Sequence, residues 1–174
     1  MEVMDAIKSR RSTRSFDQRP LPKELMEEIE NAILNSPSGS NAQESYFVIV
    51  QDEKQINLIK RFAPGLSGKP AAVVVLCSNG TESLIQGGMD TAEVLRFVNL
   101  GIAASYILLA AHSNGVGNCP VRSFHAKAIK NILGLPDDVE PELLISLGYA
   151  DMPPRPKTSK QKREVISYDQ YGIN

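Results

Sequence analysis

Apolar residues recur along this chain with helical spacing in some segments and as short unbroken runs in others. Helical spacing predicts a short helix before residue 10 and a second helix beginning at Pro22. The apolar positions of these two helices are Val3, Met4, Ile7, Leu25, Ile29, Ala32 and Ile33. Asp52 is suited to cap a third helix over residues 53–62, and a long apolar helix is predicted from Asp90 to Asn114.

Unbroken runs of β-forming residues predict strands over residues 46–50, 71–77 and 143–147, with a shorter extended segment over 115–120. The first two strands flank one helix, and this succession suggests a right-handed parallel crossover. A last helix is expected between Ser123, as its cap, and Gly134. Residues 79–88 are polar and contain glycine, so we expect a loop there. The fold class is therefore α+β, with helices around a small mixed β-sheet.

The 174 residues contain no internal repeat and no long polar linker, so a single domain over 1–174 is expected. Residues 151–174 form a C-terminal extension. Its proline-rich beginning favours an extended path that could reach beyond its own subunit.

Charge and composition exclude several classes of function. Nineteen basic and twenty acidic residues nearly balance, which disfavours nucleic-acid binding. The N-terminus lacks a signal-peptide pattern, and polar residues interrupt the apolar segment 94–111, so we expect neither secretion nor a membrane span. Cys77 and Cys119 are consistent with buried, reduced thiols in a cytoplasmic protein. His112 and His125 have no partner at metal-ligand spacing, and no catalytic nucleophile–base pair is evident.

The strongest chemical signal is the basic cluster that follows the first helix. It contains Arg10, Arg11, Ser12 and Arg14. Guanidinium groups match phosphate oxygens bidentately, and hydroxyls can fill the remaining acceptor positions. Cations near a helix C-terminus also complement its dipole, so the cluster alone leaves both interpretations open, with the solvated surface favoured.

A second candidate is the loop that ends the second helix, with Pro37, Ser38, Gly39, Ser40 and Asn41. Small residues allow a ligand close to the backbone, and amide side chains both donate and accept, which suits a flat heteroaromatic ring. The same residue types also form ordinary turns.

Two further segments carry weaker signals. In the first, an extended segment meets a helix start and leaves backbone N–H groups free for an electron-rich acceptor. Its residues are Pro120, Val121, Arg122 and Ser123. The second is the basic tail with Lys157, Ser159 and Lys160, which is either a solvated tail or the far side of a phosphate site.

The basic cluster, the Pro37-Ser38-Gly39-Ser40-Asn41-Ala42-Gln43 loop and Gly148-Tyr149-Ala150 before the basic tail, in this order and spacing, resemble the FMN-dependent nitroreductase family. The similarity covers nearly the whole chain. It implies a sandwich-like α+β fold, an intertwined homodimer, and one FMN in each of two interface sites.

The resemblance also assigns roles. It implies that Arg10, Ser12 and Arg14, supported by Arg11, bind the FMN phosphate and ribityl chain together with the Lys157 region. The loop over residues 37–41 would come from the partner subunit and line the flavin ring. Pro120 would pack on the ring, and the backbone N–H groups of Arg122 and Ser123 would face its N5 and O4 edge.

The implied activity is ping-pong reduction of nitroaromatic, quinone or related small acceptors by NADH or NADPH. No side chain is assigned as catalytic, because the flavin carries the redox chemistry. The alternatives are a flavin-binding or flavin-processing protein without turnover, and a dimeric interaction module.

Two positions depart from the family pattern. Where a Lys-x-Arg is common, Lys157 is followed by Ser159 and then Lys160, so either could substitute at the phosphate. A basic Arg122 beside the flavin would favour an anionic substrate.

Overall fold

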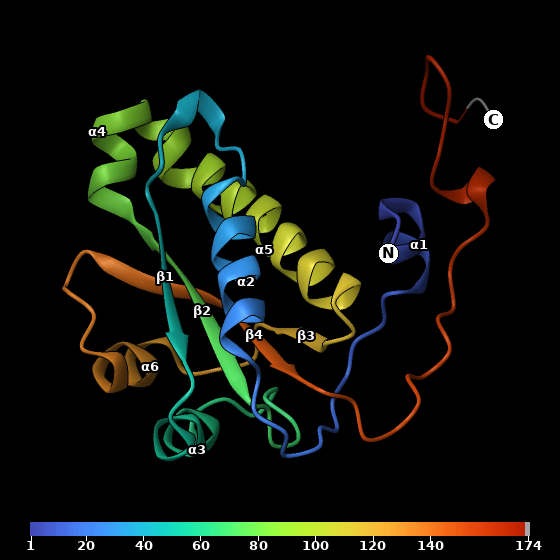
Figure 1. The fold of residues 1–174 in the computed structure, drawn as a ribbon. Coiled ribbons are helices and arrows are strands. Elements are labelled where there is room, and N and C mark those ends of the chain that lie inside the picture. Colours follow the sequence, from blue (N-terminus) through green and yellow to red (C-terminus); the bar gives the residue numbers. More distant parts are fainter. Residues whose placement is uncertain (173–174) are drawn as a thin grey trace.

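The computed structural model describes residues 1–172 as a four-stranded sheet with helices on both faces (Figure 1). The strands are β1 (Ser45–Val50), β2 (Ala72–Asn79), β3 (Gly117–Val121) and β4 (Val139–Gly148). The helices are α1 (Val3–Ser9), α2 (Lys23–Leu34), α3 (Glu53–Arg61), α4 (Gly80–Asp90), α5 (Arg96–Ser113) and α6 (Ala126–Leu133). Short helical turns cover Gly39–Asn41 (η1), Thr91–Leu95 (η2) and Lys162–Glu164 (η3).

The sheet order is β1-β2-β4-β3, and every neighbouring pair is antiparallel. The expected parallel crossover between the first two strands, and with it the mixed sheet, is therefore wrong. The cause lies in burial: helices cover both faces of this antiparallel sheet, so its central strand is as uniformly apolar as a parallel one. All eight residues of β2 are buried.

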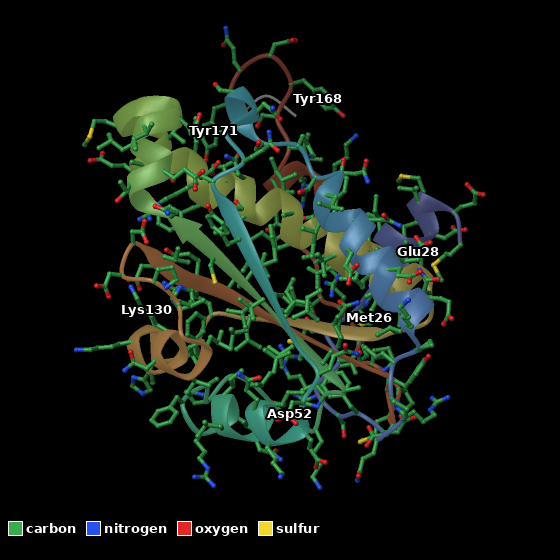
Figure 2. All side chains as sticks on the ribbon, turned by 60° about the vertical axis from the view of Figure 1, so that its left-hand side comes forward. Met26, Glu28, Asp52, Lys130, Tyr168 and Tyr171 are labelled. Carbon is green, nitrogen blue, oxygen red and sulfur yellow. The ribbon has the colours of Figure 1, made fainter. Side chains whose placement is uncertain are left out.

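Two hydrophobic cores lie on opposite faces of the sheet. Along β2, Val74 and Leu76 join the core beneath α2 and α5, while Val73 and Val75 join the core above α3 and α6. This alternation is the period-two pattern of a strand. Figure 2 shows Asp52 at the start of α3, where its Oδ1 accepts a hydrogen bond of 2.8 Å from the Gln55 N–H, confirming the expected cap.

Two local predictions differ from the structure around α4 and α5. The expected loop over residues 79–88 is mostly α4, which begins where the Asn79 Oδ1 accepts from the Glu82 N–H at 2.9 Å. Asp90 does not cap a helix, because it has helical dihedrals and continues into the π-helical turn η2. Gly88, with φ 73°, interrupts α4 just before that turn, and a π-turn marks where the backbone is re-aimed.

The start of α6 also differs from the prediction. Its N-cap is His125, and Ser123 instead lies two residues earlier, where its carbonyl oxygen accepts from the Gly65 N–H at 3.1 Å. The predicted end of the helix is confirmed, because Gly134 is left-handed with φ 65°.

The helical stretch Gly80–Ser113 is long and apolar enough to cross a membrane by length and composition. Within it, α5 contributes Leu100, Ala104, Ile107 and Ala111 to the core against the sheet. This packing is that of the core helix the sequence predicts.

The C-terminal segment leaves the body of the molecule. In Figure 1 it runs up the outer side, past α1, and every residue over 151–172 is exposed. It carries apolar side chains, including Val165, Ile166 and Tyr168, which are between 45% and 62% exposed. Tyr168 is labelled on this segment in Figure 2.

Candidate functional site

The basic segment is fixed along the free edge of β3. Ser12 forms a parallel bridge with Asn118, and the Thr13 N–H donates to the Asn118 carbonyl at 2.9 Å. Thr13 is buried against Gly117, where a Cβ atom would lie 2.7 Å from the Thr13 hydroxyl. The glycine therefore lets the segment approach the strand. Inward Thr13 and Phe16 anchor the segment, and Arg14 faces solvent.

The three arginines of this segment have different environments. The Arg11 guanidinium donates to the carbonyl oxygens of Lys8 and Arg10, both at 2.8 Å, so it is committed to the end of α1. Arg10 has a buried Nη1 atom with no hydrogen-bond partner among residues 1–172. Arg14 is exposed, and in that described part of the chain no carboxylate lies within 4 Å of any of the three.

A buried, unpartnered guanidinium nitrogen is costly unless an anion completes it. The positive charge of this segment also affects the pKa of the neighbouring His112. Burial, followed by the charges of Arg10 and Arg11, lowers the pKa of this imidazole. Its Nε2 lies 2.8 Å from the Ser9 hydroxyl, which ties α1 to the C-terminal end of α5. The segment therefore fits a phosphate.

The tail supplies a fourth arginine that the sequence analysis missed. Arg155, together with Ser12, Arg14 and Ser15, lines a cavity of about 210 Å³. Lys157, Ser159 and Lys160, the predicted distal partners, are exposed residues of the extended tail and do not line this cavity. The available signal was the position of Arg155 between two prolines, whose fixed φ holds it in an extended segment near the domain.

The loop over residues 37–43 has an unusual backbone. Ser40, Asn41 and Gln43 all have left-handed dihedrals, with φ between 52° and 54°. Such conformations cost free energy for residues other than glycine and persist only where surrounding contacts impose them. Pro37 and Ser38 line a cavity of about 190 Å³ between α2 and α5.

A buried relay holds this loop in place. The Gly39 N–H donates to the Asn99 Oδ1 at 2.9 Å, and the Asn99 Nδ2 donates to the Glu44 Oε1 at 2.8 Å. Glu44 is fully buried, and its Oε2 has no hydrogen-bond partner within residues 1–172. Neither Glu44 nor Asn99 is predicted from the sequence. In the sequence, Glu44 is an acidic residue just before a predicted strand, and Asn99 is an amide within an apolar helix.

The predicted segment after β3 leaves two backbone donors free. Within the described residues, the N–H groups of Arg122 and Ser123 donate no hydrogen bond. Pro120 is exposed at the edge strand, whereas the Val121 side chain is buried in the core shared with α3 and α6. Only the backbone of Val121 can therefore contact a ligand.

The cysteines and the metal-ligating side chains of residues 1–172 do not favour thiol or metal chemistry. Burial, and then Glu142 and Glu140, raise the pKa of Cys77 to about 12, which keeps this thiol protonated. Cys119 is also buried. The same part of the chain holds no cluster of three metal-ligating side chains.

Comparison with known proteins decides the family. Residues 7–149 match the family model described as "Nitroreductase family", which is most of the chain. The chain belongs to the nitroreductase family. A relative named "Putative NADH dehydrogenase/NAD(P)H nitroreductase", from Methanothermobacter thermautotrophicus, is 29% identical over 86% of this chain and 78% of its own length.

Two further similar proteins cover most of the chain. "FMN reductase [NAD(P)H]" of Bacillus subtilis is 24% identical over 99% of this chain and 75% of its own length. The solved structure of the "NADPH:FMN oxidoreductase from Vibrio harveyi complexed with NAD+" has a TM-score of 0.86 and 26% identity, covering 97% of this chain and 77% of that chain.

Within this nitroreductase-family chain, the arginine segment (residues 10–16) and the loop over residues 37–43, called the ring-side loop after the role that the resemblance implies, lie at opposite ends of α5. The ring-side loop is bonded to Asn99 near the N-terminal end, and α1 is bonded to His112 near the C-terminal end. At 1.5 Å per residue these two points are roughly 20 Å apart along the axis. The 210 Å³ cavity is lined by residues 12–15 and by the tail, and the 190 Å³ cavity is lined by the loop together with α2, β1 and α5. The two segments lie apart in Figure 1.

Proposed function

We propose that this protein is an FMN-dependent NAD(P)H oxidoreductase that reduces nitroaromatic, quinone or related small acceptors by a ping-pong mechanism. The observation that carries the proposal is the buried Nη1 of Arg10, a cation without a hydrogen-bond partner among residues 1–172, in the same short segment as Ser12 and Arg14. The names of the relatives that cover most of this chain support FMN and a nicotinamide donor.

The residues fit the cofactor in three parts. Arg10, Ser12 and Arg14 would hold the phosphate with charge-assisted bonds, and Arg11 would stiffen the segment. Arg155 is a better-placed distal partner than Lys157, Ser159 or Lys160, since it lines the cavity that Ser12 and Arg14 line, although Arg10 does not line it.

The other two parts serve the ring. Pro37–Asn41 would line it with donors and acceptors, and Pro120 would pack on it. The free N–H groups of Arg122 and Ser123 would donate to its electron-rich edge.

Bound FMN supplies the hydride and electron transfer, so the protein needs no acid–base pair for that chemistry. The chain's own groups orient the ring and leave one face open to donor and acceptor in turn. Reduction of a nitro group to a nitroso group takes two electrons and two protons and releases water. The hydride from NAD(P)H accounts for both electrons and one of the two protons, and solvent supplies the second proton.

We also propose that the site is completed by a second copy of the chain. Only Ala6 of α1 is buried, and Val3, Met4 and Ile7 are 67%, 58% and 49% exposed. This apolar face and the exposed tail suit a subunit interface. A homodimer would bring the ring-side loop of one copy to the arginine segment of the other. Its buried free cysteines fit a cytoplasmic location.

The function is tested by anaerobic titration of the FMN-loaded protein with NADH and, separately, NADPH. We expect the flavin colour to bleach with at least one donor and to return with a nitroaromatic or a quinone. Parallel lines in initial-rate plots at varied donor and acceptor concentrations would support ping-pong turnover. Tight FMN binding without bleaching by either donor would favour a flavin-binding protein without turnover.

A further inference from the structure

Arg122 occupies the same sheet edge as the arginine segment but stands well apart from it. Asn118 bonds Thr13, and Arg122 follows four residues later, about 13 Å along an extended chain. Its unbonded backbone N–H lies next to that of Ser123. A charged side chain at this point cannot reinforce the phosphate site directly, so its role is separate.

The Arg122 side chain is held loosely and remains available. It is 68% exposed, its guanidinium carbon lies 5.4 Å from the centre of the Phe124 ring, and its Nη2 lies 3.9 Å from the Glu142 Oε2. That distance is too long for a hydrogen bond, and the contact involves only one nitrogen. Phe124 and Glu142 thus orient the guanidinium without using its paired donors.

Glu142 is itself fixed by other groups. Its side chain is 14% exposed, and its Oε1 accepts from the Ser78 hydroxyl at 3.2 Å. The Ser78 oxygen in turn accepts from the Arg96 Nη1 at 3.3 Å. The Glu142 carboxylate therefore has a partner of its own, and it offsets the Arg122 charge only in part.

We propose that Arg122 makes the site select electron acceptors that carry a carboxylate or sulfonate beside the reducible group. The inference rests on the proposed function, because it assumes that the free N–H groups of Arg122 and Ser123 face the flavin. A planar guanidinium with free paired donors matches a carboxylate bidentately, which a lysine or a neutral residue cannot do. Glu142 weakens this preference, because its carboxylate offsets part of the Arg122 charge.

The test uses two pairs of compounds that differ in one charge. Binding of benzoate and benzamide to the oxidised, FMN-loaded protein is followed by the flavin absorbance, which needs no turnover. Reduction of 4-nitrobenzoate and 4-nitrobenzamide is followed with the preferred donor. The readout in each case is the ratio of the charged to the neutral compound, so a change common to both cancels.

We expect Arg122→Gln to lower the benzoate-to-benzamide ratio about tenfold, the effect of one charge-assisted contact at a partly exposed site. Glu142→Gln, which keeps the acceptor for Ser78, should raise the ratio by about twofold to threefold. Lys127→Gln, an exposed position on α6, is the matched control and should leave the ratio within twofold. A merely structural role of the segment would not move the two ratios in opposite directions.

Three results would overturn the proposal. One is an unchanged ratio in Arg122→Gln, and another is a ratio that moves the same way in both variants. The third is a shift confined to the preference between NADPH and NADH, which would assign the charge to the donor's phosphate. Failure of the proposed function is distinct, because the wild-type protein would then not be bleached by either donor.

Discussion

The arginine segment and the ring-side loop are stabilised in opposite ways. The arginine segment is held through its backbone, by Asn118 and the close contact of Thr13 with Gly117, while the Arg10 Nη1 has no hydrogen-bond partner and Arg14 no carboxylate partner among residues 1–172. The ring-side loop is strained at three residues and is held by the buried Asn99–Glu44 relay. The first region therefore keeps binding groups free at a cost in stability, and the second uses protein contacts to preset a shape.

The largest expected effect is on the arginine segment. Arg10→Ala with Arg14→Ala should weaken FMN binding at least about 100-fold, since two charge-assisted contacts of about 1.5–3 kcal/mol each are lost. Stability of the apoprotein should stay the same or rise, because the buried, unpartnered guanidinium nitrogen of Arg10 is removed. FMN fluorescence titration and urea unfolding measure the two quantities. Arg61→Ala, at an exposed position at the end of α3, is the control. Equal loss of binding and stability would contradict this description of the segment.

Loss of the Asn99–Glu44 relay should lower the stability of the apoprotein, unlike loss of the arginines. Asn99→Leu removes both of its hydrogen bonds and leaves Glu44 buried without a partner, so we expect a loss of about 2–4 kcal/mol in unfolding free energy. FMN binding should weaken as well, because the loop is no longer preset. Ser105→Ala, on the exposed side of the same helix, should change stability by less than about 0.5 kcal/mol. Wild-type stability in Asn99→Leu would show that the relay does not support the loop.

A smaller effect tests the strain in the loop. Ser40→Gly should stabilise the apoprotein by about 0.5–1 kcal/mol, since glycine adopts the left-handed conformation without steric cost. In helical α5, Ser105→Gly should instead destabilise by a few tenths of a kcal/mol. Thermal unfolding of the pair compares the two backbones. The same sign in both variants would mean that Ser40 is not strained.

The smallest expected effect concerns pH. The folded-state pKa of His112 lies below its usual value of 6.5, so below that pH the unfolded state binds more protons than the folded state. Stability should therefore fall as the pH drops from about 6.5 toward the folded pKa, and be fully present above 6.5. His112→Gln should flatten this part of the profile. If the slope of stability against pH persists in His112→Gln, another titrating group causes it.

The sequence signal for the arginine segment is more local than the signal for the ring-side loop. Three arginines within five residues carry their charge wherever the chain folds, so the signal is local. The loop depends on a hydrogen bond between Gly39 and Asn99, which are sixty residues apart. No sequence spacing predicts such a contact. The sheet shows the same limit, because burial of β2 on both faces hides whether its neighbours are parallel. Arg155 was missed because only the folded tail brings it to Ser12.

In the proposed homodimer, one FMN site takes its arginine segment from one subunit and its ring-side loop from the other. This arrangement is tested by a mixed dimer with different tags on its two chains. One chain carries Arg10→Ala and Arg14→Ala, and the other carries Ser38→Trp, at an extended backbone position facing the loop cavity. Each variant alone should bind FMN poorly.

In the mixed dimer, a shared site combines both defects at one interface and leaves the other interface intact. We predict one tightly bound FMN for every two chains, measured by flavin content and titration of the doubly purified dimer. If each site were built from a single chain, both sites would carry a defect. A mixed dimer that binds no FMN tightly, or chains that do not associate, would contradict the claim.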